Sequence, residues 1–168
     1  MSPIIAHGAA FNFIACRRYA DAINVCQNAI DISPDYPLLR LWLGVAYEQQ
    51  ARYGEAIAEF EKSVQLLGGQ PIALGSLGHV YSGAGRQSEA LSILDRLLEL
   101  HCQTPIDPYS VALVYARVGR HNEAIEWLGK GCHSHSGWFA YVANGDPRLE
   151  SLRSDPRFIN LLHRMGQG

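Results

Sequence analysis

Apolar residues recur along this chain with the spacing of helices, and a longer pattern groups those helices. Near the end of the chain, apolar residues return every three or four positions, as one face of a helix requires, at Phe158, Leu161, Leu162 and Met165. Over most of the chain the pattern repeats every 34 residues, in four copies that span 3–36, 37–70, 71–104 and 105–138. This period indicates a helical-repeat protein whose copies each form two antiparallel helices.

Several positions of the repeat keep one kind of residue in every copy. Positions 8 and 20 are small, which lets the two helices of a copy approach closely. Position 11 is aromatic and fills the core, position 16 is arginine, and position 19 is acidic. Position 8 holds Ala10, Gly44, Gly78 and Ala112; position 11 holds Phe13, Tyr47, Tyr81 and Tyr115; position 16 holds Arg18, Arg52, Arg86 and Arg120; position 19 holds Asp21, Glu55, Glu89 and Glu123; and position 20 holds Ala22, Ala56, Ala90 and Ala124.

The turn between the two helices of a copy also has a signature. Gly85 and Gly119 occupy position 15 of the last two copies, where they predict a left-handed residue that ends the first helix. The arginine that follows lies near the negative end of that helix, and the acidic residue of position 19 falls in the first turn of the second helix. The charges therefore agree with the proposed helix boundaries.

The repeat resembles the tetratricopeptide repeat, whose pattern is W-x₂-L-G-x₂-Y, A-x₃-F and P. The second copy meets this pattern most fully, at Leu43, Gly44, Tyr47, Ala56 and Phe60, whereas Arg40 stands at the tryptophan position. The resemblance implies an all-α, right-handed solenoid of four helix pairs that covers residues 3–138. It also implies a scaffold that binds other proteins rather than an enzyme.

The sequence of the remaining segment, 139–168, predicts capping helices. Asp146-Pro147 and Asp155-Pro156 each place an N-cap residue before a first-turn proline, so each pair should open a short helix. We expect these helices to cover the apolar side of the final repeat. The tail also resembles the C-terminal end of multidomain bacterial signalling proteins, in which a winged-helix, adenylate cyclase or Ser/Thr kinase domain precedes the repeats.

Composition favours a cytoplasmic module. The 168 residues are 48% hydrophobic and 18% charged, with a net charge of −2, so no nucleic-acid footprint is expected. The four cysteines form no paired motif, which fits a reducing compartment. The apolar run from Ile4 to Ala15 is too short to cross a membrane and contains His7 and Asn12.

Candidate chemistry is sparse. No phosphate loop, nucleophile elbow or metalloprotease helix is present, so neither catalysis nor a cofactor is expected. Cys132, His133 and His135 are metal-ligand types, but three donors within four residues rarely reach one metal, and we expect a solvated loop without metal. His79 and Tyr109 lack a nucleophile to serve as acid–base partners and are better assigned to the lining of a groove.

The first helices of stacked repeats line a concave groove, and the resemblance places a protein or peptide partner there. Its lining is mostly aliphatic and aromatic, and the two lysines of the chain lie outside it, so no carboxylate clamp is expected. The expected lining residues are Leu38, Leu41, Val45, Glu48, Gln49, Ile72, His79, Ser82, Ile106, Tyr109, Leu113 and Arg117. The alternative is that the solenoid's own curvature or its C-terminal helix buries part of this surface.

Three functional hypotheses follow. The first is a groove that binds a peptide or a partner domain, and the second is a sensory module for a small apolar ligand. The third is self-association, or contact with a missing upstream domain, through the unusually apolar first helix, for which Ile4, Ile5 and Phe11 are the candidate residues.

Overall fold

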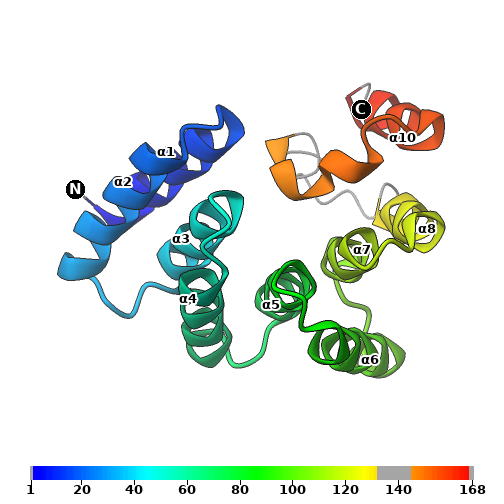
Figure 1. Cartoon of the computed structure of the whole chain (residues 1–168), viewed down its shortest axis with the longest axis horizontal. Helices are drawn as coiled ribbons and strands as arrows, with labels where there is room; N and C mark the ends of the chain where they lie inside the picture. The colour runs from blue at the N-terminus through cyan, green and yellow to red at the C-terminus, as the bar shows by residue number, and fades with distance from the viewer. Residues whose placement is uncertain (1, 132–144, 167–168) are drawn as a thin grey trace.

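The computed structural model describes residues 2–131 and 145–166, and within these ranges the regular structure is entirely helical (Figure 1). Four helix pairs are followed by a 3₁₀ helix and a last α-helix. The helices are α1 Pro3–Ala15, α2 Tyr19–Ile32, α3 Pro37–Gln49, α4 Tyr53–Leu66, α5 Pro71–Gly83, α6 Gln87–Gln103, α7 Pro108–Arg117, α8 His121–Gly131, η1 Pro147–Leu152 and α10 Pro156–Gly166. The predicted all-α repeat solenoid is confirmed.

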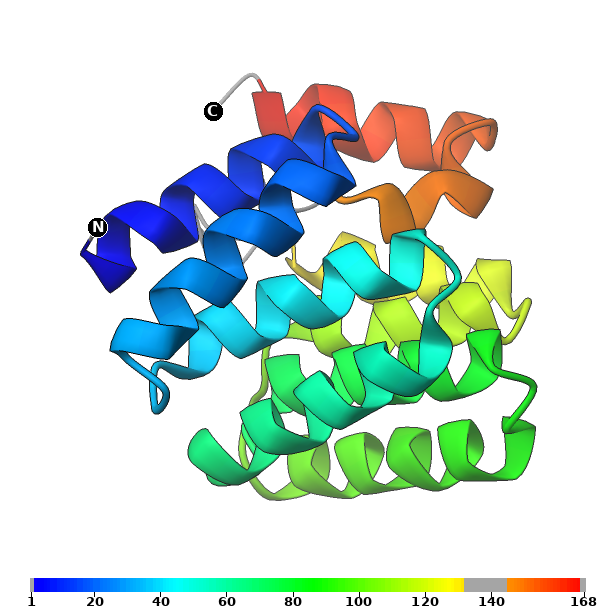
Figure 2. The ribbon, with the colours of Figure 1, turned by 60° about the vertical axis from the view of Figure 1, so that its left-hand side comes forward.

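The helix pairs form an arc. Helices α3, α5 and α7 line its inner side and α4, α6 and α8 lie outside, while η1 and α10 lie across its open side (Figure 1). Figure 2 shows α10 and η1 above α7 and α8, and α10 contacts α8. In the described ranges, no helix has the length and apolar character needed to cross a membrane.

Proline sets the start of the inner helices. Pro3, Pro37 and Pro71 begin α1, α3 and α5, where the missing N–H costs nothing. The fourth inner helix differs from the repeat, because α7 begins at Pro108 rather than at Pro105. Asp107 caps it by accepting a hydrogen bond from the Tyr109 backbone N–H at 3.0 Å.

The turn at position 15 is left-handed in all four copies. Besides Gly85 and Gly119, with φ of 79° and 83°, Arg17 and Ala51 adopt φ of 59° and 57°. The sequence predicted this conformation only where glycine occupies the position. Because the repeat geometry fixes the turn, the backbone adopts it even with side chains that disfavour it.

The arginine of position 16 joins the two helices of each copy. Its guanidinium lies over the aromatic ring of position 11 and pairs with the carboxylate of position 19. The four sets are Arg18 with Phe13 and Asp21, Arg52 with Tyr47 and Glu55, Arg86 with Tyr81 and Glu89, and Arg120 with Tyr115 and Glu123. The arginine therefore links the first helix of a copy to the second, in addition to its favourable place near the negative end of the first helix.

The tail touches both ends of the arc. The predicted helix starts at Pro147 and Pro156 are confirmed, and α10 lies against α8 with Phe158 and Leu161 buried. The tail also reaches the first repeat, because a β-carbon on Gly145 would lie 3.2 Å from the Phe11 ring. The Arg17–Glu150 ion pair, at 2.8 Å, adds a second link. The tail thus closes the inner side of the arc as well as covering its end.

Candidate functional site

A buried polar cluster lies where the tail meets the inner helices. Arg148 of η1 donates from Nε to Asp146 Oδ1 at 2.9 Å and from Nη1 to Ser76 Oγ of α5, also at 2.9 Å. The Tyr109 hydroxyl of α7 donates to the other carboxylate oxygen of Asp146. All four residues are buried, so the cluster fastens the tail to two helices of the concave face.

The charges of this cluster stabilise one another. Burial alone would raise the pKa of the Asp146 carboxyl, but the charge and hydrogen bonds of Arg148 outweigh it and lower that pKa. Burial, reinforced by the Asp146 charge, raises the pKa of Tyr109 well above its ordinary value. Asp146 and Arg148 are therefore an ionised pair, and the Tyr109 hydroxyl remains a donor.

A second buried pair joins α3 to α5. His79 Nδ1 lies 2.6 Å from Glu48 Oε1, and both side chains are almost fully enclosed. His79 Nε2 and Glu48 Oε2 have no hydrogen-bond partner among the described residues. His79 and Tyr109, both expected as groove lining, thus bond to two different carboxylates, Glu48 and Asp146.

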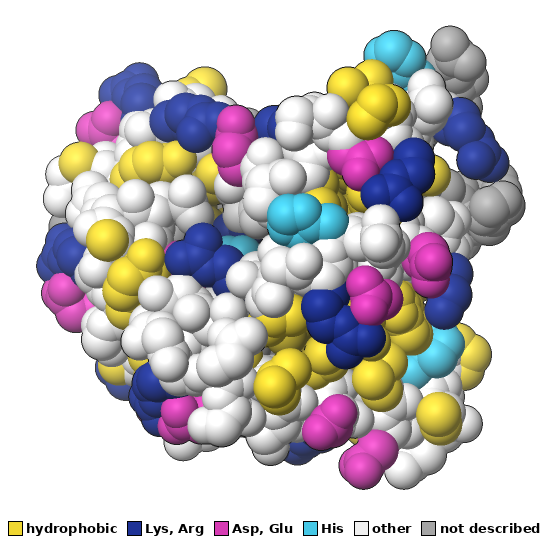
Figure 3. Space-filling model, turned by 45° about the vertical axis from the view of Figure 1, so that its right-hand side comes forward, with side chains coloured by type: hydrophobic (Ala, Val, Ile, Leu, Met, Phe, Trp, Pro, Cys, Tyr) yellow, Lys and Arg dark blue, Asp and Glu magenta, His cyan; other side chains and the backbone are white. Residues whose placement is uncertain are grey.

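Beside these pairs lies a cavity of about 380 Å³ between the first repeat, the last repeat and the tail. Its lining is rich in charged and polar side chains, and it consists of Arg17, Gln49, His79, Ala116, Arg117, Gly119, His121, Pro147, Arg148, Glu150 and Ser151. In Figure 3, arginine and histidine side chains lie at the middle of the face shown, with both charge signs interspersed around them. Three arginines and one glutamate face this cavity.

The expected groove residues fall into three groups. Leu41, Val45, Glu48, His79, Tyr109 and Leu113 are buried; Leu38, Gln49, Ile72, Ser82 and Ile106 are half-buried; and Arg117 is exposed. The tail provides part of the cover, since Tyr109 donates to its Asp146. A partner that reached Tyr109 would have to replace this contact. The cover by the C-terminal segment corresponds to the alternative raised from the sequence.

Sequence reasoning did not identify Asp146 and Arg148 as part of the site. The Asp-Pro-Arg motif predicts only the start of a helix. The structure confirms this start, because Asp146 also accepts a hydrogen bond from the Arg148 backbone N–H at 2.9 Å. The same motif recurs at Asp155 and Arg157, on the surface. Local sequence therefore carried no signal that separates the buried copy from the exposed one.

The first helix presents part of the expected self-association surface. Ile4 and Ile5 are 69% and 62% exposed, and Ile32, at the same end of the helix pair, is 67% exposed. Phe11 is buried against Trp42, with ring centroids 5.2 Å apart. Phe11 therefore belongs to the core, whereas the three isoleucines are exposed to solvent.

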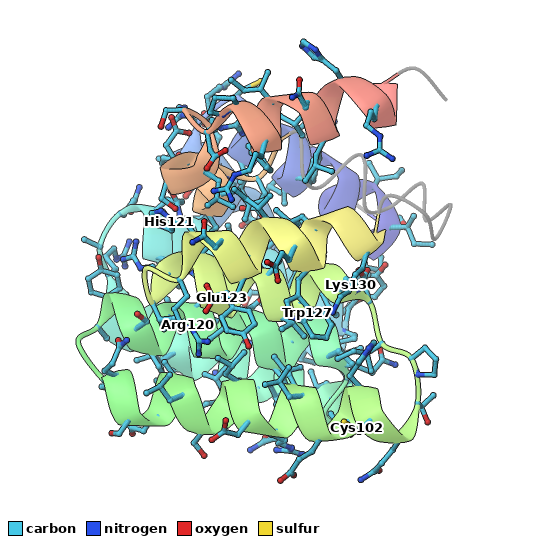
Figure 4. The ribbon with its side chains drawn as sticks, turned by 90° about the vertical axis from the view of Figure 1, so that its right-hand side faces the viewer. Cys102, Arg120, His121, Glu123, Trp127 and Lys130 are labelled. Carbon is cyan, nitrogen blue, oxygen red and sulfur yellow. The ribbon has the colours of Figure 1, made fainter. Side chains whose placement is uncertain are left out.

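The outer face offers less chemistry. Figure 4 shows Glu123, Trp127 and Lys130 along α8 and Cys102 on α6. Lys130 Nζ lies 3.9 Å from the centre of the Trp127 ring, which is a packing contact rather than a site. Within the described part of the chain, no cluster of three His, Cys, Asp or Glu residues could hold a metal. Cys132, His133 and His135 lie outside that part.

The cysteines show no redox pairing in the described residues. Cys16 and Cys102 are exposed and free, and Cys26 is buried in the core of the first helix pair. Burial raises the pKa of the Cys26 thiol to about 12, which keeps it protonated and unreactive.

Comparisons with known proteins agree with the repeat. Two family models, both described as Tetratricopeptide repeat, match residues 13–63 and 73–105. Tetratricopeptide repeat protein 21B of Mus musculus is 38% identical over 39 residues, which are 23% of this chain and 3% of that protein. The chain thus spans a small fraction of this relative's length.

Solved structures share the fold at low sequence identity. A putative kinesin light chain from Podosopora anserina with nearly identical TPR-like repeats has a TM-score of 0.56 at 15% identity, covering 96% of this chain and 92% of that one. YrrB, a TPR protein with an unusual peptide-binding site, has a TM-score of 0.52 at 17% identity, covering 96% and 84%. At these identities the likeness concerns the fold alone.

Proposed function

Because this chain carries tetratricopeptide repeats, we propose that it is a non-enzymatic scaffold that binds a peptide or partner domain along the concave face of its repeats. The observation that carries this proposal is that the concave face already holds a peptide segment. Arg148 of the tail bonds to Ser76 of α5, and Tyr109 of α7 bonds to Asp146 of the tail. The inner helices thus offer both polar anchors and apolar surface to a chain that crosses them.

The open part of this face suggests what the partner looks like. Leu38, Ile72 and Ile106 occupy position 2 of three successive copies and are all half-buried. Leu38 and Ile72 lie in the first turns of α3 and α5, and Ile106 lies just before α7, so we infer that they form an aliphatic row. Aliphatic side chains in shallow, partly desolvated positions suit apolar anchors on a partner. The partner we propose is therefore an amphipathic helix or an extended segment with spaced apolar residues.

A selected peptide tests the proposal. Peptides are enriched by display against the wild-type protein, and binding of the best one is measured by calorimetry. Leu38→Gln and Ile72→Gln should each weaken it by about tenfold or more, equivalent to roughly 1.4 kcal/mol. Leu91→Gln is the matched control, because Leu91 is 40% exposed on α6 outside the arc. Equal losses in all three variants, or none, would contradict binding at the concave face.

The tail's resemblance to the C-terminal ends of multidomain bacterial signalling proteins supports a narrower proposal. In that setting the repeats are the cytoplasmic, C-terminal interaction part of a larger regulator. An immunoblot of the source cells with an antibody against the repeats should then detect a species much larger than the 18.5 kDa of this chain. A single species of 18.5 kDa would argue against the larger protein.

Self-association is a second candidate, favoured by the exposed Ile4, Ile5 and Ile32. Exposed aliphatic side chains gathered at one end of a solenoid gain free energy when a second surface covers them. Sedimentation velocity over a range of concentrations should then show dimers that Ile5→Glu removes and Leu91→Glu leaves intact. A monomer at every concentration would eliminate this candidate.

A further inference from the structure

We propose that the cavity between the first repeat, the last repeat and the tail binds a small anion that carries a carboxylate or phosphate group. Its volume of about 380 Å³ falls within the range of small-molecule sites. Its charged and polar lining makes it unsuited to an apolar ligand, in contrast to the sensory hypothesis drawn from the sequence. The site is separate from the aliphatic row of Leu38, Ile72 and Ile106, so it stands or fails independently of peptide binding.

The charges on the cavity wall favour an anion. Arg148 is neutralised by Asp146, and Arg17 by Glu150 at 2.8 Å. Arg117 is exposed, and its guanidinium has no carboxylate partner among the described residues; its side-chain contact is the Tyr53 hydroxyl at 3.4 Å. When Glu48 is paired with a protonated His79, the charge of Arg117 therefore remains unbalanced. A guanidinium binds carboxylate and phosphate through two parallel hydrogen bonds.

An unpartnered buried nitrogen points to the same ligand. His79 is 1% exposed and lines the cavity, and its Nδ1 is held by Glu48 at 2.6 Å. The opposite ring nitrogen, Nε2, has no partner in the described structure, which is costly for a buried polar atom. Protonated, the ring donates from Nε2 to an anion while Glu48 balances its charge.

The geometry gives each residue a role. Arg117 of α7 supplies the free charge at the mouth, and His79 of α5 supplies a donor on the wall. Gln49 and Ser151 line the same space and can bond other polar groups of the ligand. Glu48 is a positioning residue, since its hydrogen bond sets the orientation of the imidazole. An anion held here would bridge repeats and tail and stabilise the closed arc.

Proton linkage follows from the role of His79. The charged and titratable groups that line the cavity or contact the ring are Glu48 on α3, Arg148 and Glu150 on η1, Arg117 at the end of α7, Arg17 after α1 and His121 at the start of α8. A protonated imidazole donates from both ring nitrogens, whereas a neutral one donates from only one. Acid should therefore strengthen anion binding, and this gain should depend on His79.

Calorimetric titration of the full chain tests the site, with inorganic phosphate, sulfate and succinate as probes at constant ionic strength. We expect saturable one-site binding of phosphate or succinate, which also raises the midpoint of thermal unfolding. Preference for succinate identifies a carboxylate ligand, and preference for phosphate a phosphorylated one. Arg117→Gln should weaken binding by about tenfold or more. Its control, Arg96→Gln, removes an arginine that is likewise exposed but lies on α6 outside the arc.

The outcomes that overturn the proposal are distinct. Heats without saturation for all three probes, or equal losses in Arg117→Gln and Arg96→Gln, would mean unspecific charge screening. Sulfate keeps its charge near neutral pH, so any pH dependence of sulfate binding reports on the protein. That dependence should vanish in His79→Gln and persist in His121→Gln. Because Arg117 is exposed, its variant keeps the test valid even if His79→Gln fails to fold.

Discussion

The Arg148 guanidinium donates to the Ser76 hydroxyl at 2.9 Å, across 72 residues of sequence. Ser76 lies in the middle of α5, and its hydroxyl in turn donates to the Ile72 carbonyl one turn earlier. The tail is therefore anchored to the centre of the concave face. This one contact joins the stability of the repeats to the position of the tail.

The two Asp-Pro-Arg motifs should respond differently to the loss of arginine. Arg148→Met leaves Asp146 buried without a counter-charge, which costs about 3–5 kcal/mol. Arg157→Met at the exposed copy should cost less than about 1 kcal/mol. Urea unfolding of the two variants gives both values. Costs of similar size would mean that the buried pair does not hold the tail in place.

The double variant Asp146→Leu, Arg148→Met distinguishes the contribution of the ion pair from the cost of leaving one charge buried without its partner. Replacing both charges by apolar side chains removes the unpaired charge, so most of the loss seen in Arg148→Met should be recovered. A double variant as unstable as Arg148→Met would show that the hydrogen bonds to Ser76 and Tyr109, rather than the charge pair, carry the stability.

Acid should loosen the tail. The pKa of Asp146 lies below its ordinary value of 3.8 in the folded protein, so its contribution is present above that pH and is lost as the pH falls through the folded value. Hydrogen bonds from Arg157 lower the pKa of Asp155 to about 2, which adds to the same loss. The free energy of unfolding should drop steeply below about pH 4. Asp146→Asn should flatten part of this slope, and an unchanged slope would refute the assignment.

The repeat fold could be predicted because each position meets the same neighbours in every copy. The four alanines of position 20 are all fully buried, as their small size required. The path of the tail could not be predicted, since Asp146 and Asp155 open identical motifs and only contacts with distant Ser76 and Tyr109 distinguish them. For the same reason, the position of Tyr109 in the repeat predicts that it lines the groove but does not predict which segment covers it.

Position 15 allows a paired test of the left-handed turn. Ala51→Gly should raise stability by about 0.5 kcal/mol, because a residue with a β-carbon is strained at its φ of 57°. Gly119→Ala, at φ 83°, should lower it by about 1 kcal/mol. Thermal unfolding of both variants measures the difference. The changes in stability should have opposite signs. A loss of stability in Ala51→Gly would mean that the strain relieved at this turn is smaller than the conformational entropy that glycine adds to the unfolded chain.

The close crossing of α5 and α7 depends on Gly75. A β-carbon at this position would lie 2.5 Å from the Ser110 carbonyl oxygen, and a backbone atom cannot move aside without shifting its helix. Gly75→Ala should therefore destabilise the protein by about 1–3 kcal/mol and displace the α7 wall of the cavity. Gly8 in α1 is the matched control, because a β-carbon there meets nothing within 4 Å. Gly8→Ala should instead stabilise its helix by roughly 0.5–1 kcal/mol, and urea unfolding of the pair should show the two opposite signs. A neutral Gly75→Ala would mean that the two helices can separate freely, and the anion site, which requires Arg117 and His79 at a fixed spacing, would lose its structural basis.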